Sequence, residues 1–256
     1  MKKLINWKLF FILLIICVIT SVLVIPYSLE LTSNENEITP KILLFTAINN
    51  LVMFAIVIFL GLLLSKPKRI GMGLPILQNV LDGKNQTKEI KSILLPSFSL
   101  GITAGILIVL IGIPFNKFIP ELLKLEAPVT VWKALLASFY AGIAEEVLLR
   151  LFLVSLFVWI IFKIKKDKDG RPTVFGIWLS IILAAVFFGL GHLPATAQIT
   201  SLTGIVIVRA IVLNGIGGII FGWLYWKKGL ESAMIAHFSA DIVLHIITPF
   251  AASFFS

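Results

Sequence analysis

The chain has 256 residues, of which 59% are hydrophobic and 14% charged, so it carries too little polar surface to be a water-soluble globule. Its formal net charge of +9 does not indicate nucleic-acid binding, because the basic residues cluster in short segments between apolar runs. The single cysteine, Cys17, lies inside an apolar run, which excludes a disulfide and a cysteine zinc site.

Apolar runs recur along the whole chain, and a helix that crosses a bilayer needs roughly 20 such residues. The first run offers no small-residue cleavage site and is therefore interpreted as a retained anchor. We predict an all-α polytopic transmembrane helical bundle of about seven spans, with six to eight possible, as a single integral membrane domain over 1–256. The expected spans are Trp7–Tyr27, Ile42–Leu64, Ile93–Pro114, Val131–Ile164, Val174–Leu190, Gly204–Trp226 and Leu230–Phe250.

The basic residues predict the orientation, because Lys and Arg concentrate on the cytoplasmic side of a membrane protein. With seven spans, every basic cluster falls on one side, which places the N-terminus in the cytoplasm and the chain in the cell membrane. Residues 65–92 are expected to be a cytoplasmic loop with a short interfacial helix. The residues that carry this prediction are Lys2, Lys3, Lys8, Lys66, Lys68, Arg69, Lys163, Lys165, Lys166, Lys168, Arg171, Lys227 and Lys228, opposed by Glu30, Glu35 and Glu37.

The fourth span carries Glu145, Glu146 and Arg150, and each charge inside a span costs about 2.5–3.5 kcal/mol. Glu146 and Arg150 are four residues apart and share a helix face, so they can form an ion pair. Glu145 points elsewhere and has no counter-ion on its helix. A desolvated carboxylate of this kind accepts protons readily, which suits a general base. A purely structural Glu–Arg pair is the alternative, although it would leave the second carboxylate unexplained.

Histidines lie on two further spans. Phe188 and His192 are four apart at the end of the fifth span, and His237, Asp241 and His245 form one polar stripe on the seventh. His237 and Asp241 can touch directly, as when a carboxylate orients an imidazole. An interfacial His192 and a hydrogen-bonded seam between helices are the alternatives. For His192 and His237 to lie at the same depth, the helices beside the Lys165–Arg171 loop must extend beyond the membrane.

These residues give the chain a resemblance to the CPBP intramembrane proteases, a family that includes the type II CAAX prenyl endopeptidases. The family pattern Glu-Glu-x-x-x-Arg is matched by Glu145, Glu146 and Arg150. Phe-x-x-x-His is matched by Phe188 and His192, and His-x-x-x-Asn/Asp by His237 and Asp241. The resemblance covers roughly Val131 to Ile247, so 131–250 is expected to be the catalytic core, and the flanking residues look typical of bacterial members.

The resemblance implies hydrolysis of peptide bonds inside the membrane by a water that Glu145 and His192 activate. His237 and Asp241 would then stabilise the oxyanion, with Asp241 expected to orient His237 because an ionised Asp donates no hydrogen bond. Glu146, Arg150 and Phe188 are expected to support the site. We expect no cofactor; the alternative is a zinc ion held by His192, His237 and Glu145.

Arg209 is an intramembrane charge outside the three motifs. It either snorkels to the interface, pairs with Asp241, or binds the carboxylate of a substrate. The expected partners are the lipid bilayer and a peptide or membrane-protein substrate, whose identity and prenylation the sequence does not specify. Two other functions fit the sequence: a non-catalytic membrane immunity protein that binds peptide toxins, and a proton-coupled transporter, although no inverted repeat supports the latter.

Overall fold

The structure is a computed structural model that describes residues 4–31, 39–66, 70–119 and 129–252. These residues form helices joined by short connections, with one isolated β-bridge between Lys166 and Pro172 and no strand in the described ranges. The helices are α1 (Trp7–Leu23), α2 (Ile25–Leu31), α3 (Pro40–Leu64), α4 (Pro75–Leu81), α5 (Thr87–Asn116), α6 (Val131–Tyr140), η3 (Ala141–Glu145), η4 (Val147–Val154), α7 (Ser155–Ile164), α8 (Val174–Gly191), α9 (Leu193–Thr196), α10 (Gly204–Lys228), α11 (Leu230–Ile242), η5 (Val243–Ile247) and α12 (Thr248–Ala252), where η marks a π-helical stretch.

Within the described residues, seven helical segments are long and apolar enough to cross a membrane, which confirms the all-α polytopic bundle. The largest difference from the expected spans is at α5, which begins at Thr87 rather than at Ile93. The added turn contains Lys88, Glu89 and Lys91, good helix formers that hydropathy alone assigns to a loop. The short helix expected inside residues 65–92 is α4.

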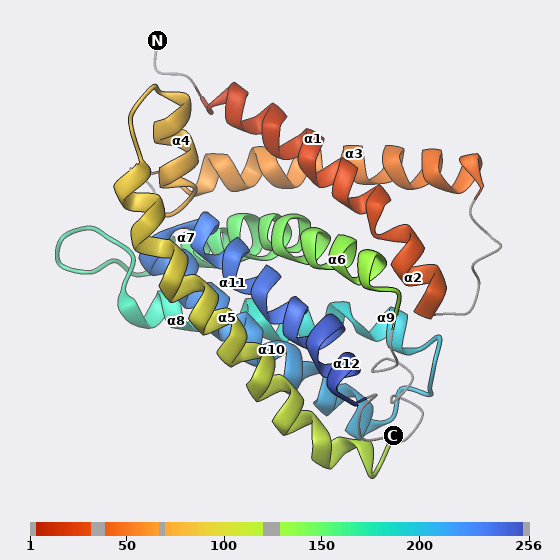
Figure 1. Ribbon diagram of the computed structural model, residues 1–256. Coiled ribbons are helices and arrows are strands. Elements are labelled where there is room, and N and C mark those ends of the chain that lie inside the picture. The colour runs from red at the N-terminus through yellow and green to blue at the C-terminus, as the bar shows by residue number, and fades with distance from the viewer. Residues whose placement is uncertain (1–3, 32–38, 67–69, 120–128, 253–256) are drawn as a thin grey trace.

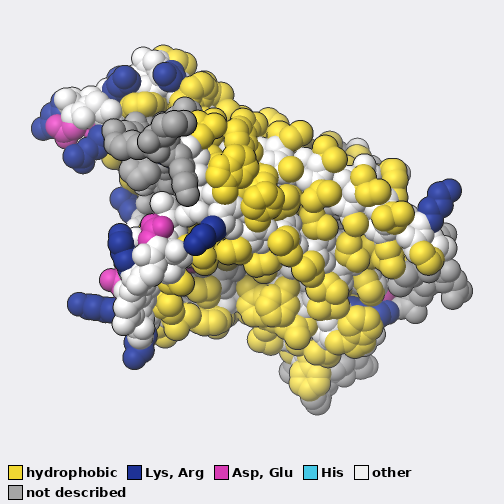
Figure 2. All heavy atoms as spheres, turned by 90° about the horizontal axis from the view of Figure 1, so that it is seen from above, with side chains coloured by type: hydrophobic (Ala, Val, Ile, Leu, Met, Phe, Trp, Pro, Cys, Tyr) yellow, Lys and Arg dark blue, Asp and Glu magenta, His cyan; other side chains and the backbone are white. Residues whose placement is uncertain are grey.

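The basic residues of the α7–α8 loop and of the α10–α11 turn lie at one end of the bundle, beside α4 and the start of α5 (Figure 1). In Figure 2 charged side chains gather along that edge, whereas hydrophobic side chains cover the middle of the visible face. Which side of the membrane this end occupies stays a prediction. Lys2, Lys3, Glu35, Glu37, Lys68 and Arg69, on which that prediction partly rests, lie outside the described part of the chain.

Large apolar side chains point outward along the spans, as expected of helices whose solvent is lipid. On α1 the exposed residues recur every fourth position, and the same spacing continues on α3. These stripes are Phe11, Ile15 and Ile19 on α1 and Leu44, Ile48, Val52 and Ile56 on α3.

Glycines allow the helices around the centre of the bundle to approach closely. A Cβ on Gly101 of α5 would collide with the backbone carbonyl of Ala236 on α11, and one on Gly142 of η3 would lie 3.0 Å from the carbonyl oxygen of Met234. Gly218 of α10 packs in the same way on Ala185 of α8. Because lipid supplies no hydrophobic drive for association, such close backbone packing is what holds membrane helices together.

The turn between α10 and α11 is fixed by residues of the α3–α5 connection. Gly229 adopts a φ of +97°, which favours glycine. The N–H of Leu230 donates to the carbonyl of Gly73 at 2.8 Å. At the next residue, Oε1 of Glu231 accepts from the N–H of Leu77 at 2.8 Å and so caps α4. The start of α11 is thereby anchored before its polar stripe begins.

Replacing Gly101 by Ala should destabilise the protein, because the added methyl group has no space between α5 and α11. Overpacking of this kind costs about 1–3 kcal/mol. Gly215→Ala is the matched control, since a Cβ there meets nothing within 4 Å. Thermal unfolding of the purified protein in detergent should show a lower Tm for Gly101→Ala and an unchanged or raised Tm for Gly215→Ala. Equal Tm values would contradict the close packing of α5 on α11.

Candidate active site

The fourth span is π-helical where its charged residues lie. Ala141–Glu145 and Val147–Val154 form π-helical stretches on either side of Glu146. Bonds from residue i to i+5 widen a helix and recur at functional sites. An ideal α-helix would separate Glu145 from Glu146 by about 100°. In this widened segment, both carboxylates approach the imidazole of His237, each from the side of a different ring nitrogen.

Glu146 is the centre of a fully buried polar group. Its Oε1 lies 2.6 Å from Nη1 of Arg150, with the two side chains 0% and 2% exposed. The same oxygen lies 2.7 Å from Nδ1 of His237, so Nδ1–H donates to it. The ion pair expected from the four-residue spacing is therefore present, and it also fixes an imidazole from another span. This second contact joins residues 91 positions apart, which the motif spacing did not reveal.

Two further carboxylates face the other edge of His237. Nε2 lies 3.8 Å from Oε2 of Glu145 and 3.7 Å from Oδ1 of Asp241. These distances exceed a direct hydrogen bond but leave both carboxylates beside the same nitrogen. The shortest contact that orients His237 is thus made by Glu146, whereas the sequence assigned that role to Asp241. Glu145 is the more accessible of the two glutamates, with 21% of its side chain exposed.

Aromatic rings enclose this charged cluster. Phe221 of α10 stacks on His237, with ring centroids 4.7 Å apart and an interplanar angle of 26°. The guanidinium of Arg150 lies 5.3 Å from the ring of Phe188 and 5.4 Å from that of Phe221. Cation–π contacts of this kind stabilise a charge removed from water. Phe221 belongs to none of the three motifs, and its only signal in the sequence is its place on the glycine-rich face of α10 with Gly218 and Gly222.

His192 lies immediately after α8 and is held by the preceding turn. Its Nδ1 is 2.9 Å from the carbonyl oxygen of Phe188, so Nδ1 carries the proton and Nε2 is left as an acceptor. The ring of Phe188 contacts both histidines, at 4.9 Å from His192 and 5.7 Å from His237. Among the described residues, no hydrogen bond or ion pair joins His192 to Glu145, His237 or Asp241. The structure thus places His192 one aromatic ring away from the cluster.

The contact between Phe188 and His237 fixes the relative depth of α8 and α11. At about 1.5 Å per residue, Phe188 lies about 21 Å along α8 from Val174, whereas His237 lies about 10 Å along α11 from Leu230. The basic end of α8 therefore extends about 10 Å farther than that of α11. Figure 1 shows the connection between α7 and α8 projecting at this end. This extension allows His192 to lie beside the cluster.

The residues proposed as alternative zinc ligands do not form a ligand set. Within the described part of the chain, no three His, Cys, Asp or Glu side chains lie where they could hold a metal ion together. His192, His237 and Glu145 are therefore not arranged as three zinc ligands in the described residues. That the protein works without a cofactor stays a prediction.

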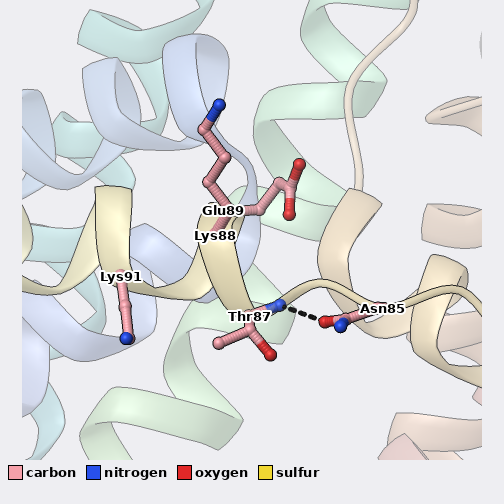
Figure 3. Close-up of a pocket in the computed structure, with 5 residues that line it drawn as sticks. All are labelled: Asn85, Thr87, Lys88, Glu89 and Lys91. Carbon is pink, nitrogen blue, oxygen red and sulfur yellow. Dashed lines mark hydrogen bonds between the residues drawn. The ribbon is translucent and has the colours of Figure 1, made fainter.

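Two other features of the molecule are Arg209 and a surface hollow at the start of α5. Arg209 lies partly buried on α10, and its proposed contact with substrate stays a prediction. A surface hollow at the start of α5 is lined by Asn85, Thr87, Lys88, Glu89 and Lys91, and the two lysine side chains point in different directions (Figure 3). The hollow lies about 20 Å along α5 from Gly101, which packs beside His237, so it is separate from the cluster.

One comparison with known proteins gave a match. Residues 127–243 match the family described as type II CAAX prenyl endopeptidase Rce1-like. This segment contains Glu145, Glu146, Arg150, His192, His237 and Asp241 but excludes α1 to α5. No curated protein and no solved structure gave a significant match.

Replacing Arg150 should lower the free energy of unfolding far more than replacing a cation in a solvent-exposed ion pair. Arg150→Met leaves the 0% exposed Glu146 without its counter-ion, which costs about 3–5 kcal/mol. Lys133→Met is the control, because its partner Glu30 is 21% exposed and such pairs contribute about 0–1 kcal/mol. Unfolding by SDS, followed by circular dichroism, measures both variants. Similar losses would contradict the buried role of Arg150.

Proposed function

We propose that the chain is an intramembrane endopeptidase, because residues 127–243 match the type II CAAX prenyl endopeptidase Rce1-like family. It hydrolyses a peptide bond of a membrane-associated peptide or protein by means of an activated water. The observation that carries the proposal is that the two neighbouring glutamates differ in their contacts and in their exposure. Glu146 is bonded to Arg150 and His237, whereas Glu145 is partly accessible and close to His237 only at 3.8 Å.

Glu145 is the general base in this proposal. A base must reach the water whose proton it takes, and Glu145 is the more accessible carboxylate of the pair, with 21% of its side chain exposed. His192 is its partner, because the acceptor Nε2 of its ring can hold one hydrogen of the same water. The water oxygen bonds to the scissile carbonyl carbon, and as the C–N bond breaks, Glu145 returns the proton to the leaving amine nitrogen. Glu145 is thereby restored to its ionised form.

His237 is placed to stabilise the oxyanion of the tetrahedral intermediate. Glu146 fixes its orientation through Nδ1, so Nε2 is directed towards Glu145 and Asp241. In its protonated form, His237 donates from Nε2 to a developing negative charge. Such a donor is most effective when it is held rigidly before the reaction. The stacked ring of Phe221 and the buried Glu146–Arg150 pair provide that rigidity.

The family name refers to prenylated CAAX tails, and we propose that the substrate reaches the site from the membrane. Both a prenylated peptide and an unmodified transmembrane peptide meet that requirement. The assay therefore uses two internally quenched peptides with the same sequence, one with and one without a C-terminal farnesylated cysteine motif.

Replacing Glu145 by Gln should lower kcat by about 10²–10⁴-fold, the usual contribution of a general base. Gln keeps the size of the side chain and removes its ability to take a proton. The matched control is Glu231→Gln, which lies on α11 and retains an oxygen to accept from Leu77. Cleavage of both quenched peptides by purified protein in detergent measures the effect. Hydrolysis that Glu145→Gln retains in full, or no hydrolysis by the wild-type protein, would contradict the proposal.

Hydrolysis should be insensitive to metal chelators, because water activation is assigned to Glu145 and His192 alone. Adding EDTA or 1,10-phenanthroline to the same cleavage assay should leave the initial rate unchanged. A loss of activity that added Zn²⁺ restores would show that a metal takes part and would overturn this assignment.

A further inference from the structure

The connection between α7 and α8 is an ordered hairpin that projects from the end of the bundle (Figure 1). Lys166 and Pro172 form its β-bridge, and the N–H of Asp167 donates to the carbonyl of Arg171 at 2.9 Å. Oδ1 of Asp167 accepts from the N–H groups of Asp169 at 2.9 Å and Arg171 at 2.7 Å. These bonds close the turn, as in other Asx turns. Residues 163–173, the α7–α8 hairpin, therefore hold their side chains on a fixed scaffold.

The α7–α8 hairpin is basic, and its own carboxylates do not neutralise it. Residues 163–171 contain five basic side chains and two acidic ones, and all five basic side chains are exposed. Asp167 is occupied by the backbone of the turn. Among the described residues, no carboxylate forms an ion pair with any of the five. The hairpin thus presents cations that lack a protein counter-ion.

The end of α10 brings further cations to the same place. Trp226 packs edge to face on Trp178, one turn inside α8, with ring centroids 6.0 Å apart. Lys227 and Lys228 follow Trp226 directly and are exposed. The cations at the end of α10 therefore lie beside the start of α8, where the hairpin ends.

Three of these lysines lie over aromatic rings of the spans. Tryptophan and other aromatic residues gather at the depth of the lipid headgroups, where one side of the ring is apolar and the other meets water. Ammonium groups that lie over such rings are held at the same depth. The pairs are Lys163 over Trp159 at 5.6 Å, Lys166 over Phe162 at 5.0 Å and Lys227 over Trp226 at 3.5 Å from the ring centroid.

Large apolar side chains are exposed directly beside these cations. Ile164, between Lys163 and Lys165, is 82% exposed, and Phe175, at the start of α8, is 75% exposed. A surface that combines exposed apolar side chains with cations is typical of an element that lies in the boundary between headgroups and acyl chains. An acidic protein segment would pair with the cations but would leave Ile164 and Phe175 in water. The combination therefore fits a lipid better than a soluble anion.

We propose that the α7–α8 hairpin and the end of α10 form a binding site for anionic phospholipid. The lysines contact the phosphate of the headgroup, and Ile164 and Phe175 contact its acyl chains. Clusters of basic residues beside a membrane span attract anionic headgroups in this way. Trp178 precedes Phe188 by about 15 Å along α8, so the lipid site is separate from the charged cluster around His237. The inference does not depend on the proposed hydrolysis.

Short-chain lipids test the site with the purified protein in a neutral detergent. Dioctanoyl phosphatidylglycerol should raise the Tm, because a ligand that binds only the folded state stabilises it. Dioctanoyl phosphatidylcholine has the same chains without net charge and should leave the Tm unchanged. The triple variant Lys163→Gln/Lys166→Gln/Lys227→Gln should need about tenfold more phosphatidylglycerol, or more still, for the same rise in Tm. Its Tm without lipid should equal that of the wild type, since the three side chains are exposed.

The matched control removes the same number of charges from the same end of the bundle. Lys84→Gln/Lys88→Gln/Lys91→Gln replaces three exposed lysines before and on the first turn of α5, and it should respond to phosphatidylglycerol as the wild type does. Equal responses of the two triple variants, whether retained or lost, would overturn the inference, because they would show that the hairpin is not a distinct site.

Two further arms distinguish a lipid from other anions. Ile164→Ser/Phe175→Ser keeps every charge and should also weaken the response to phosphatidylglycerol. Inorganic phosphate and a polyglutamate peptide carry negative charge without acyl chains, so neither should raise the Tm at the same concentration. A rise with either of them as large as that with phosphatidylglycerol would show that the hairpin selects anions by charge alone, and would overturn the assignment to a lipid.

Discussion

The arrangement of the whole site depends on one buried carboxylate. Glu146 is 0% exposed and binds both Arg150 on its own span and His237 on the last one. Removing two charges from water is costly, and Oε1 of Glu146 offsets that cost by contacting both partners, whereas its Oε2 is buried without a hydrogen-bond partner among the described residues. The rings of Phe188 and Phe221 lie 5.3 and 5.4 Å from the guanidinium of Arg150 and cover it. With Glu146 occupied in this way, Glu145 is the member of the adjacent pair that is left to face an incoming molecule.

Small residues determine where that carboxylate meets its histidine. Gly142 lies three residues before Glu145 and brings the backbone of α11 to the π-helical stretch at Met234 and Phe238, on either side of His237. Gly101 brings α5 to the same level from the opposite side, at Ala236. The polar atoms of the site are thus positioned by backbone contacts rather than by long flexible side chains. In lipid this packing also replaces the hydrophobic drive that would hold helices together in water.

The spans and the Glu146–Arg150 pair could be predicted because both follow from local patterns: apolar length for the spans, and a spacing of four residues for the pair. The start of α5 was wrong by six residues, because Thr87–Ser92 is helical without being apolar. The bond between His237 and Glu146 could not be predicted, since it joins positions 91 apart and the π-helical turns alter which faces meet. Phe221 was missed for a related reason. In an apolar span, the sequence pattern does not distinguish an aromatic residue that lines the site from one that faces lipid.

The boundary of the matched segment does not coincide with a boundary in the packing. Residues 127–243 exclude α5, yet the glycine face of α5 lies directly on the backbone of α11 at Ala236 and Ala240. A fragment cut at residue 127 would expose to acyl chains a strip of helix backbone shaped to receive another helix. It would also lack Ser97, whose hydroxyl is bonded to Ser232 at 2.6 Å within that interface. The matched motifs therefore pack directly on a span that precedes the matched segment, so α5 is part of the same helix bundle rather than a separate anchor.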